Sequence, residues 1–196
     1  MTATTTARSG TTINFLDPDP DTLLIEDIAF SLSNLCRYTG HVEFYSVAEH
    51  SLHVSDLTPP EYQLEALLHD ATEAYLGDVH TPLKNVLTQY KSIERIVHEA
   101  VRQRFLLAPE PDCVKWADRR LLATETRDLF PGGQPDWECL KGVPCMDRRI
   151  EPLPPKAARA LFLDRFHYLW NMRHGMPYSH HSPYGQQKRA IANAMR

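Results

Sequence analysis

Apolar residues recur every three or four positions over several stretches of the chain, which is the spacing of one face of an α-helix. This pattern predicts helices over about residues 25–36, 46–56, 61–76, 91–107, 111–129 and 155–173, with a shorter helical piece opening at residues 81–84. Extended segments are scarce, and residues 13–24 allow at most a small hairpin. The fold class that follows is all-α, with a short N-terminal hairpin left open.

Residue types at the helix ends support these boundaries. Ser46 followed by Glu49 is a capping-box pattern for the second helix. Gly77 is placed to end the third helix, because glycine adopts the left-handed conformation that commonly closes a helix. Proline-rich residues 131–155 are expected to form an irregular loop before the last helix.

The chain has 196 residues, a length that fits one domain with a sizeable core. Residues 1–12 are small and polar and are expected to be flexible. Residues 13–174 would form the domain, and residues 175–196 a polar C-terminal tail. The apolar helices exceed what a compact monomer needs, so we expect a homo-oligomer.

Composition narrows the compartment and the partners. The sequence has no run of about 18 apolar residues and no apolar segment near its start, so we expect no membrane span and no secretory signal. The four cysteines lack metal-binding spacing and are expected to be free thiols in the cytoplasm. A net charge of −4 argues against stable binding to nucleic acid.

The densest chemistry lies in residues 67–78, Leu-Leu-His-Asp-Ala-Thr-Glu-Ala-Tyr-Leu-Gly-Asp. On a continuous helix Glu73 would share a face with His69 and Asp70, and Asp78 follows just beyond the glycine. Titratable groups next to an apolar run are costly to bury unless something pairs with them. A divalent cation would pair with a histidine and several carboxylates at once.

Two further residues complete a candidate metal site. His50 lies on an otherwise apolar helical stripe, and Asp118 lies beside inward-facing apolar positions of a later helix. With His69 and Asp70 they provide two imidazoles and two carboxylates, a set that suits Co, Mn or Zn and still allows Mg. Glu73 and Asp78 would then be free to manage protons, because the ligand set does not need them.

Basic residues flank this segment in sequence. Arg37 lies in a turn before the second helix, and Lys84 follows Pro82 after the His-Asp segment. Both are suited to contact the charge of a phosphate group. Lone histidines such as His53 and His98 are expected to have no such role, because single helical histidines are usually ordinary surface or core residues.

The order His50, His69-Asp70, Asp118 resembles the HD-domain metal-dependent phosphohydrolases. Leu32-Ser-Asn-Leu-Cys-Arg-Tyr-Thr-Gly-His, Leu67-Leu-His-Asp-Ala-Thr-Glu-Ala-Tyr and Gly77-Asp-Val-His-Thr-Pro-Leu-Lys are similar to small HD hydrolases of phages and prophages, which include bacterial 5′-deoxynucleotidases and phage dATP triphosphohydrolases. The resemblance covers about residues 25–130 and, more weakly, the last helix. It implies an HD-domain helical bundle that hydrolyses a small deoxynucleotide.

The resemblance also implies roles for individual residues. It places His50, His69, Asp70 and Asp118 on the metal, and Glu73 and Asp78 in catalysis. Arg37 and Lys84 match phosphate-contacting positions, and Tyr38 matches an aromatic residue near the sugar. We expect dATP as the preferred substrate, with dADP and dAMP, released as deoxyadenosine. Two alternatives stay open: a 5′-deoxynucleotidase that accepts dNMPs of any base, and a module that binds nucleotides without hydrolysis.

Overall fold

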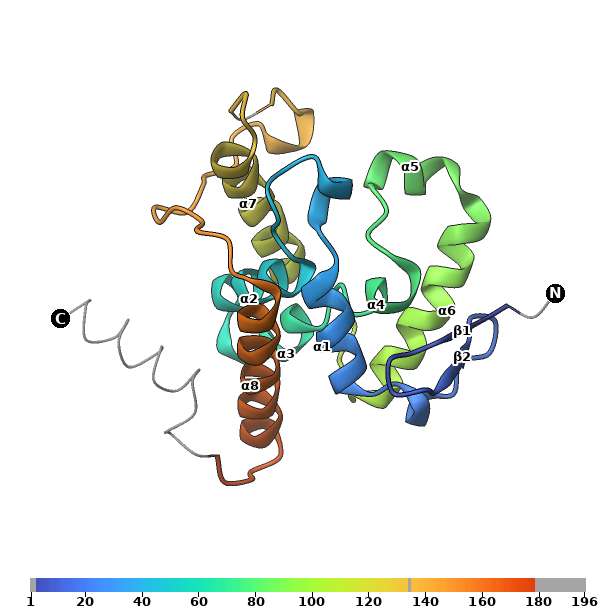
Figure 1. The fold of residues 1–196 in the computed structure, drawn as a ribbon. Helices are drawn as coiled ribbons and strands as arrows, with labels where there is room; N and C mark the ends of the chain where they lie inside the picture. Colours follow the sequence, from blue (N-terminus) through green and yellow to red (C-terminus); the bar gives the residue numbers. More distant parts are fainter. Residues whose placement is uncertain (1–2, 134, 179–196) are drawn as a thin grey trace.

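The structure, a computed structural model, is mostly helical, as the hydrophobic pattern predicts (Figure 1). It describes residues 3–133 and 135–178. In chain order the regular elements are β1 (Thr4–Thr6), β2 (Thr12–Asn14), α1 (Ile25–Asn34), α2 (Val47–Leu57), α3 (Gln63–Leu67), α4 (Glu73–Leu76), α5 (Thr81–Val86), α6 (Thr88–Arg104), α7 (Asp112–Leu129) and α8 (Pro155–Arg173). Single 3-10 turns are η1 (Pro20–Thr22), η2 (Arg37–Gly40), η3 (Pro60–Tyr62) and η4 (Glu138–Leu140). The narrower assignment to an HD-domain bundle stays a prediction.

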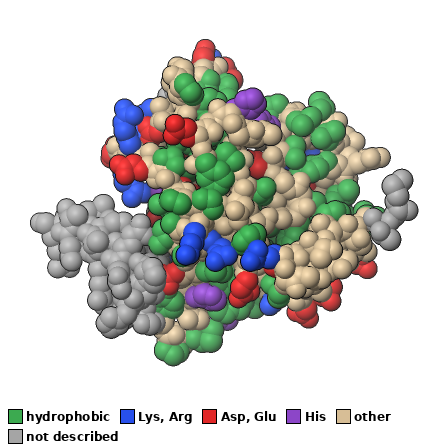
Figure 2. Space-filling view, viewed as in Figure 1, with side chains coloured by type: hydrophobic (Ala, Val, Ile, Leu, Met, Phe, Trp, Pro, Cys, Tyr) green, Lys and Arg blue, Asp and Glu red, His purple; other side chains and the backbone are tan. Residues whose placement is uncertain are grey.

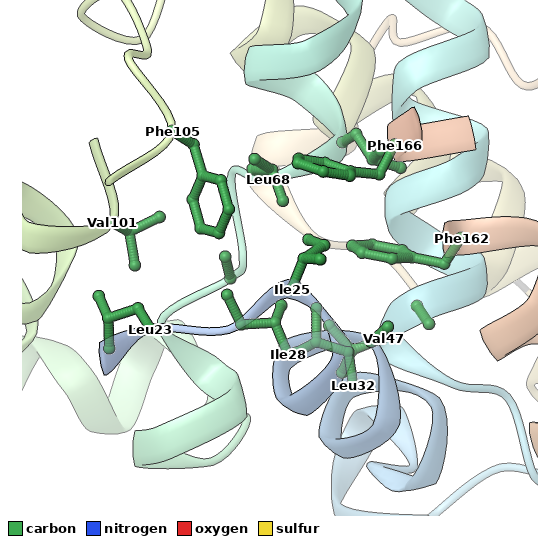
Figure 3. Packing of buried hydrophobic residues seen from close by; sticks show 14 of the residues in the cluster. Leu23, Ile25, Ile28, Leu32, Val47, Leu68, Val101, Phe105, Phe162 and Phe166 are labelled. Carbon is green, nitrogen blue, oxygen red and sulfur yellow. The ribbon is translucent and has the colours of Figure 1, made fainter. Parts of the chain in front are cut away.

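The main hydrophobic core joins α1, α2, α3, α6 and α8. Phe162 and Phe166 of α8 point from one side toward Ile25 and Leu68, while Val101 and Phe105 approach from the other (Figure 3). Figure 1 shows α8 running alongside α1 and α2. The helix predicted over residues 155–173 from its apolar stripe is confirmed at both ends by α8.

A second core lies between α2 and α7. Val54 of α2 packs there with Val114, Ala117 and Leu121 of α7. Since Val47 and Leu52 of the same helix belong to the first core, α2 lies between the two. This position buries His50 in the middle of α2 completely.

The N-terminal hairpin lies earlier in the chain than predicted. β1 and β2 pair antiparallel with Thr5 opposite Ile13, so residues assigned to a flexible terminus form a strand. Ser9, in the turn between the strands, donates its backbone N–H and its hydroxyl to the two oxygens of Asp27, at 2.9 and 2.6 Å. These bonds satisfy a carboxylate that is buried on α1, which ties the turn to the core.

The predicted continuous helix over residues 61–76 is wrong. α3 ends at Leu67 and α4 begins at Glu73, with a tight turn between them. In this turn Ala71 N bonds Leu68 O at 3.1 Å and Glu73 N bonds Asp70 O at 3.0 Å, which is the 3-10 pattern. The predicted stop at Gly77 is confirmed, with φ at 80°.

The segment before α8 is irregular, as predicted, except for η4. Leu153 N bonds the Glu49 carboxylate at 2.8 Å, and Ile150 N bonds that of Asp128 at 2.9 Å, so side chains of α2 and α7 hold the segment. Of the two hydrogen bonds of the predicted capping box, the one from Glu49 N to Ser46 Oγ forms. The Glu49 carboxylate instead accepts from Leu153 N.

Predictions about the tail beyond residue 178 lie outside the described residues. Within residues 3–133 and 135–178, no helix has both the length and the apolar character that a membrane span requires. The cytoplasmic location and the homo-oligomer stay predictions.

Candidate metal centre

Three residues from separate elements bring ligand atoms to one point. His50 comes from α2, His69 from the turn after α3 and Asp118 from α7, and their ligand atoms all lie within 4.8 Å of one another. His50 Nε2 is 3.3 Å from His69 Nε2 and 3.2 Å from Asp118 Oδ1. Two atoms bound about 2.1 Å from one cation lie roughly 3.0–3.4 Å apart at angles of about 90–110°. The cluster could therefore hold a metal ion.

Asp70 lies next to this cluster. Its Oδ2 is 3.2 Å from His69 Nε2 and 3.5 Å from His50 Nε2. The tight turn between α3 and α4 allows this, because neighbouring side chains on a regular helix diverge by about 100°. His69 Nδ1 lies 2.7 Å from Ala66 O, which fixes the ring and leaves Nε2 toward the other ligands.

A buried glutamate that the sequence analysis missed stands behind His50. Glu125 of α7 is fully buried, and its Oε1 accepts from His50 Nδ1 at 2.6 Å. The hydroxyl of Tyr38 donates to the other oxygen, and Arg37 Nη2 lies 3.3 Å from it. An acid that holds one imidazole nitrogen leaves the second free to bind a cation. Its position seven residues after Asp118 and four after Leu121, on the inward stripe, was the available signal.

The charges in this cluster favour a cation. Burial lowers the pKa of His69, but the Asp70 charge outweighs burial and raises that pKa to about 10. Burial raises the pKa of Glu125, whereas the charges of Arg37 and His50 bring it down to about 2. The carboxylates are thus ionised and draw protons onto the imidazoles. A divalent cation can take the place of those protons, so the donor set fits a metal.

Glu73 occupies a different environment from the ligand carboxylates. Burial raises its pKa well above the ordinary value, and the charges of Asp70 and Asp78 add to the effect. Its Oε2 is buried without a hydrogen-bond partner among the described residues. Lys84 Nζ lies 3.5 Å from Glu73 Oε1 and 2.7 Å from Glu94 Oε1, so Glu94 of α6 is the nearer partner of this lysine.

The remaining candidates lie close by but in unexpected roles. Arg37, predicted to contact phosphate, is 3.6 Å from Asp70 Oδ2 and 3.3 Å from Glu125, and its side chain is only 11% exposed. Tyr38, predicted near a sugar, is buried with its hydroxyl on Glu125 and its ring edge-on to Phe130. Asp78 is half-buried beyond Gly77, and within the described part of the chain no hydrogen bond joins it to the ligands.

An unusual backbone turn brings the side chains of Arg37 and Tyr38 to the Glu125 carboxylate. In η2 the φ angles of Tyr38 and Thr39 are 58° and 53°, in the left-handed region that non-glycine residues avoid. Thr39 Oγ1 lies 2.6 Å from His80 Nε2, immediately before α5. The turn therefore connects the buried acid with the helix that carries Lys84.

Two curated proteins are similar to this chain, whereas no family model matches it. YfdR of Escherichia coli K12 is 44% identical over 156 residues, which span 78% of this chain and 88% of YfdR. RCAP_rcc00048 of Rhodobacter capsulatus is 35% identical over 186 residues, which span 82% of this chain and 92% of that protein. Neither name states an activity. With this identity extending over most of both sequences, the chain belongs to the family of YfdR.

Proposed function

We propose that this protein is an HD-domain phosphohydrolase that uses a divalent cation to hydrolyse deoxynucleotide phosphates. The observation that carries the proposal is the convergence of His50, His69 and Asp118, with Asp70 beside them. His50 is fully buried, and the side chains of Asp70 and Asp118 beside it are 22% and 43% exposed. Burying an imidazole next to carboxylates is costly unless something pairs with their charges. A catalytic cation would bind the imidazole nitrogens and offset the negative charge of the carboxylates.

The cation would be held by His50, His69, Asp70 and Asp118, and Co²⁺, Mn²⁺, Zn²⁺ or Mg²⁺ suits this set. When bound, such a cation lowers the pKa of water and offsets the negative charge of a phosphate group. Two hydrogen bonds would orient the imidazole ligands: Glu125 binds Nδ1 of His50, and the Ala66 carbonyl binds Nδ1 of His69.

Glu73 has the properties of a proton-transfer group. Burial raises its pKa well above the ordinary value, which favours the protonated form, and its buried Oε2 has no protein partner in residues 3–133 and 135–178. In the proposed reaction a water oxygen bonds to the phosphorus attached to the 5′ oxygen, and the bond from phosphorus to that oxygen breaks. The leaving 5′ oxygen takes up a proton, which Glu73 can supply. Asp78 is the second carboxylate available for proton transfer.

Lys84 is placed to bind the phosphate. A phosphate oxygen would displace Glu73, 3.5 Å from Nζ, more readily than Glu94, at 2.7 Å. Lys84 would then stay anchored on α6 while releasing Glu73 for the reaction. Arg37 offsets the charges of Asp70 and Glu125 from within the protein.

The test is a substrate survey with metal-loaded protein. We expect hydrolysis of dATP, and of dADP and dAMP, to deoxyadenosine; the preference for adenine comes from the family resemblance alone. Deoxy- and ribonucleoside mono-, di- and triphosphates are each supplied with Co²⁺, Mn²⁺, Zn²⁺ or Mg²⁺. Equal release of phosphate from dAMP, dGMP and dTMP would favour a general 5′-deoxynucleotidase. Tight nucleotide binding with no turnover would favour a binding module, and folded, metal-loaded protein that neither binds nor hydrolyses any nucleotide would refute the proposal.

A further inference from the structure

A pocket of about 290 Å³ lies between the N-terminal hairpin, α1 and α4, apart from the candidate metal centre. Residues 5–8 of the hairpin form one wall, α1 from Asp27 to Leu35 forms another, and Ala74 and Tyr75 of α4 close it. None of the candidate site residues lines it. Ligand pockets commonly enclose about 300–1,000 Å³, so this one has the size for a small molecule.

The walls mix apolar and polar side chains, and one of the polar groups is unsatisfied. Ala7, Phe30 and Leu35 supply apolar surface, whereas the hydroxyl oxygen of Tyr75 is buried with no hydrogen-bond partner among the described residues. Asp27, Ser31 and Asn34 are already engaged: Asp27 accepts from Ser9 with both oxygens. Ser31 Oγ donates to Ala74 O at 2.8 Å, and the Asn34 amide donates to Phe30 O at 2.7 Å. A buried hydroxyl without a partner costs stability that a ligand acceptor would recover.

The rim of the pocket is cationic. The Arg8 guanidinium carbon lies 3.9 Å from the centre of the Phe30 ring, and that of Arg159 on α8 lies 5.6 Å from it. Neither arginine forms an ion pair with a carboxylate in the part of the chain that the structure describes. Figure 2 shows Lys and Arg side chains in a row across the middle of this face, over α8 and toward the hairpin. Unpaired guanidinium groups attract phosphate and carboxylate groups, which they bind through two parallel hydrogen bonds.

We propose that this pocket binds a small amphipathic anion, with a ring-sized apolar body beside Phe30, its phosphate or carboxylate on Arg8 and an acceptor atom on the Tyr75 hydroxyl. Arg159 adds positive charge to the same rim. The apolar body and the single anionic group are both required, because Ala7, Phe30 and Leu35 recognise the first and the rim recognises the second.

Ligand binding in the pocket should affect the candidate metal centre through α4; this step rests on the proposed function. α4 has only four residues, and its first, Glu73, directly precedes the wall residues Ala74 and Tyr75. A ligand on Tyr75 would restrict the movement of this short helix and so of the Glu73 carboxylate. The ligand is therefore expected to act as an effector that alters turnover.

The test is calorimetric titration of the full-length chain after metal removal with EDTA. The probes are phenyl phosphate, benzoate and inorganic phosphate. At least one of the two ring-bearing anions should bind, and the comparison between them identifies the anionic group preferred. Arg8→Gln should weaken binding about ten- to hundredfold, the loss expected for one charge-assisted hydrogen bond. Tyr75→Phe should weaken it less and leave the fold intact, whereas Arg95→Gln, on an exposed face of α6, should have no effect.

Several results would overturn the inference. Absence of binding by both ring-bearing anions, equal affinity in Arg8→Gln and the parent, or equally tight binding of inorganic phosphate alone would each do so. Unchanged nucleotide turnover at saturating benzoate would overturn the effector role. Nucleotide hydrolysis without probe binding would leave the proposed function standing and this pocket rejected, and probe binding without any hydrolysis would do the reverse.

Discussion

Replacing Glu125 by glutamine would test whether a buried acid holds the metal centre together. The glutamine keeps the shape of the side chain, but its amide nitrogen donates where the carboxylate oxygen accepts. The amide nitrogen would face either His50 Nδ1, which lies 2.6 Å from Oε1, or the other side, where the Tyr38 hydroxyl donates to Oε2 and Arg37 Nη2 lies 3.3 Å from it. One of the two sides therefore loses its acceptor, and His50 loses the carboxylate charge in either case.

Two effects of this substitution can be sized. Loss of a group that orients a metal ligand weakens metal binding about 10–100-fold, which is about 1.4–2.7 kcal/mol. Removing one partner of a buried ion pair costs about 3–5 kcal/mol. The Arg37 side chain is 11% exposed and keeps Asp70 at 3.6 Å, so we expect the lower end, about 3 kcal/mol. For a chain of this size that lowers Tm by about 6–12 °C.

The assay is competition between the protein and a chromophoric chelator for Co²⁺ or Mn²⁺, with thermal unfolding measured on the same samples. Glu138→Gln is the matched control, because Glu138 is exposed and, among residues 3–133 and 135–178, its carboxylate pairs with Lys141 alone. It should change neither quantity. A folded Glu125→Gln protein that binds metal as tightly as the parent would show that Glu125 does not organise the site.

Four other outcomes follow from the site. Asp118→Ala should lose bound metal by elemental analysis and lose hydrolysis with it, and retained activity would remove Asp118 from the ligand set. Glu73→Gln should keep its metal while turnover falls about 10²–10⁴-fold, as expected for a lost proton-transfer group, and a matching loss of metal would contradict that role. EDTA should lower Tm by about 5–10 °C relative to protein in metal at about 100 times its Kd, and an unchanged Tm would count against binding to the folded state. Metal affinity should fall as pH drops from about 8 to about 6, since ligand nitrogens must lose protons to bind. Burial opposes protonation of His69, but Asp70 raises its pKa to about 10, so pH-independent affinity would contradict this charge balance.

The helices were predictable where one face is apolar throughout. α2 and α8 begin and end within about a residue of the prediction, because their apolar stripes agree with the cap Ser46 of α2 and with Pro155 at the start of α8. The broken helix at residues 68–72 was not predictable from periodicity. Its residues continue a helical pattern, so the local sequence does not mark the turn.

The main residues of the candidate site were predictable from the sequence, whereas the residues that hold them in place were not. His50, His69, Asp70 and Asp118 stood out because they interrupt apolar stripes, and the structure brings them together. Glu125 interrupts a stripe in the same way, yet a single glutamate on a helix is common. Pairings such as Lys84 with Glu94 depend on how α5 and α6 meet, which no local pattern encodes.

The left-handed turn at Tyr38 and Thr39 links parts of the molecule that are far apart in sequence. Each such residue costs about 1–2 kcal/mol in backbone conformation, and the bonds of Arg37 and Tyr38 to Glu125 offset that cost. If those contacts are lost, we expect the turn to relax and the contact between Thr39 and His80, at the start of α5, to weaken. A substitution at Glu125 inside α7 is therefore expected to shift Lys84 on α5 as well.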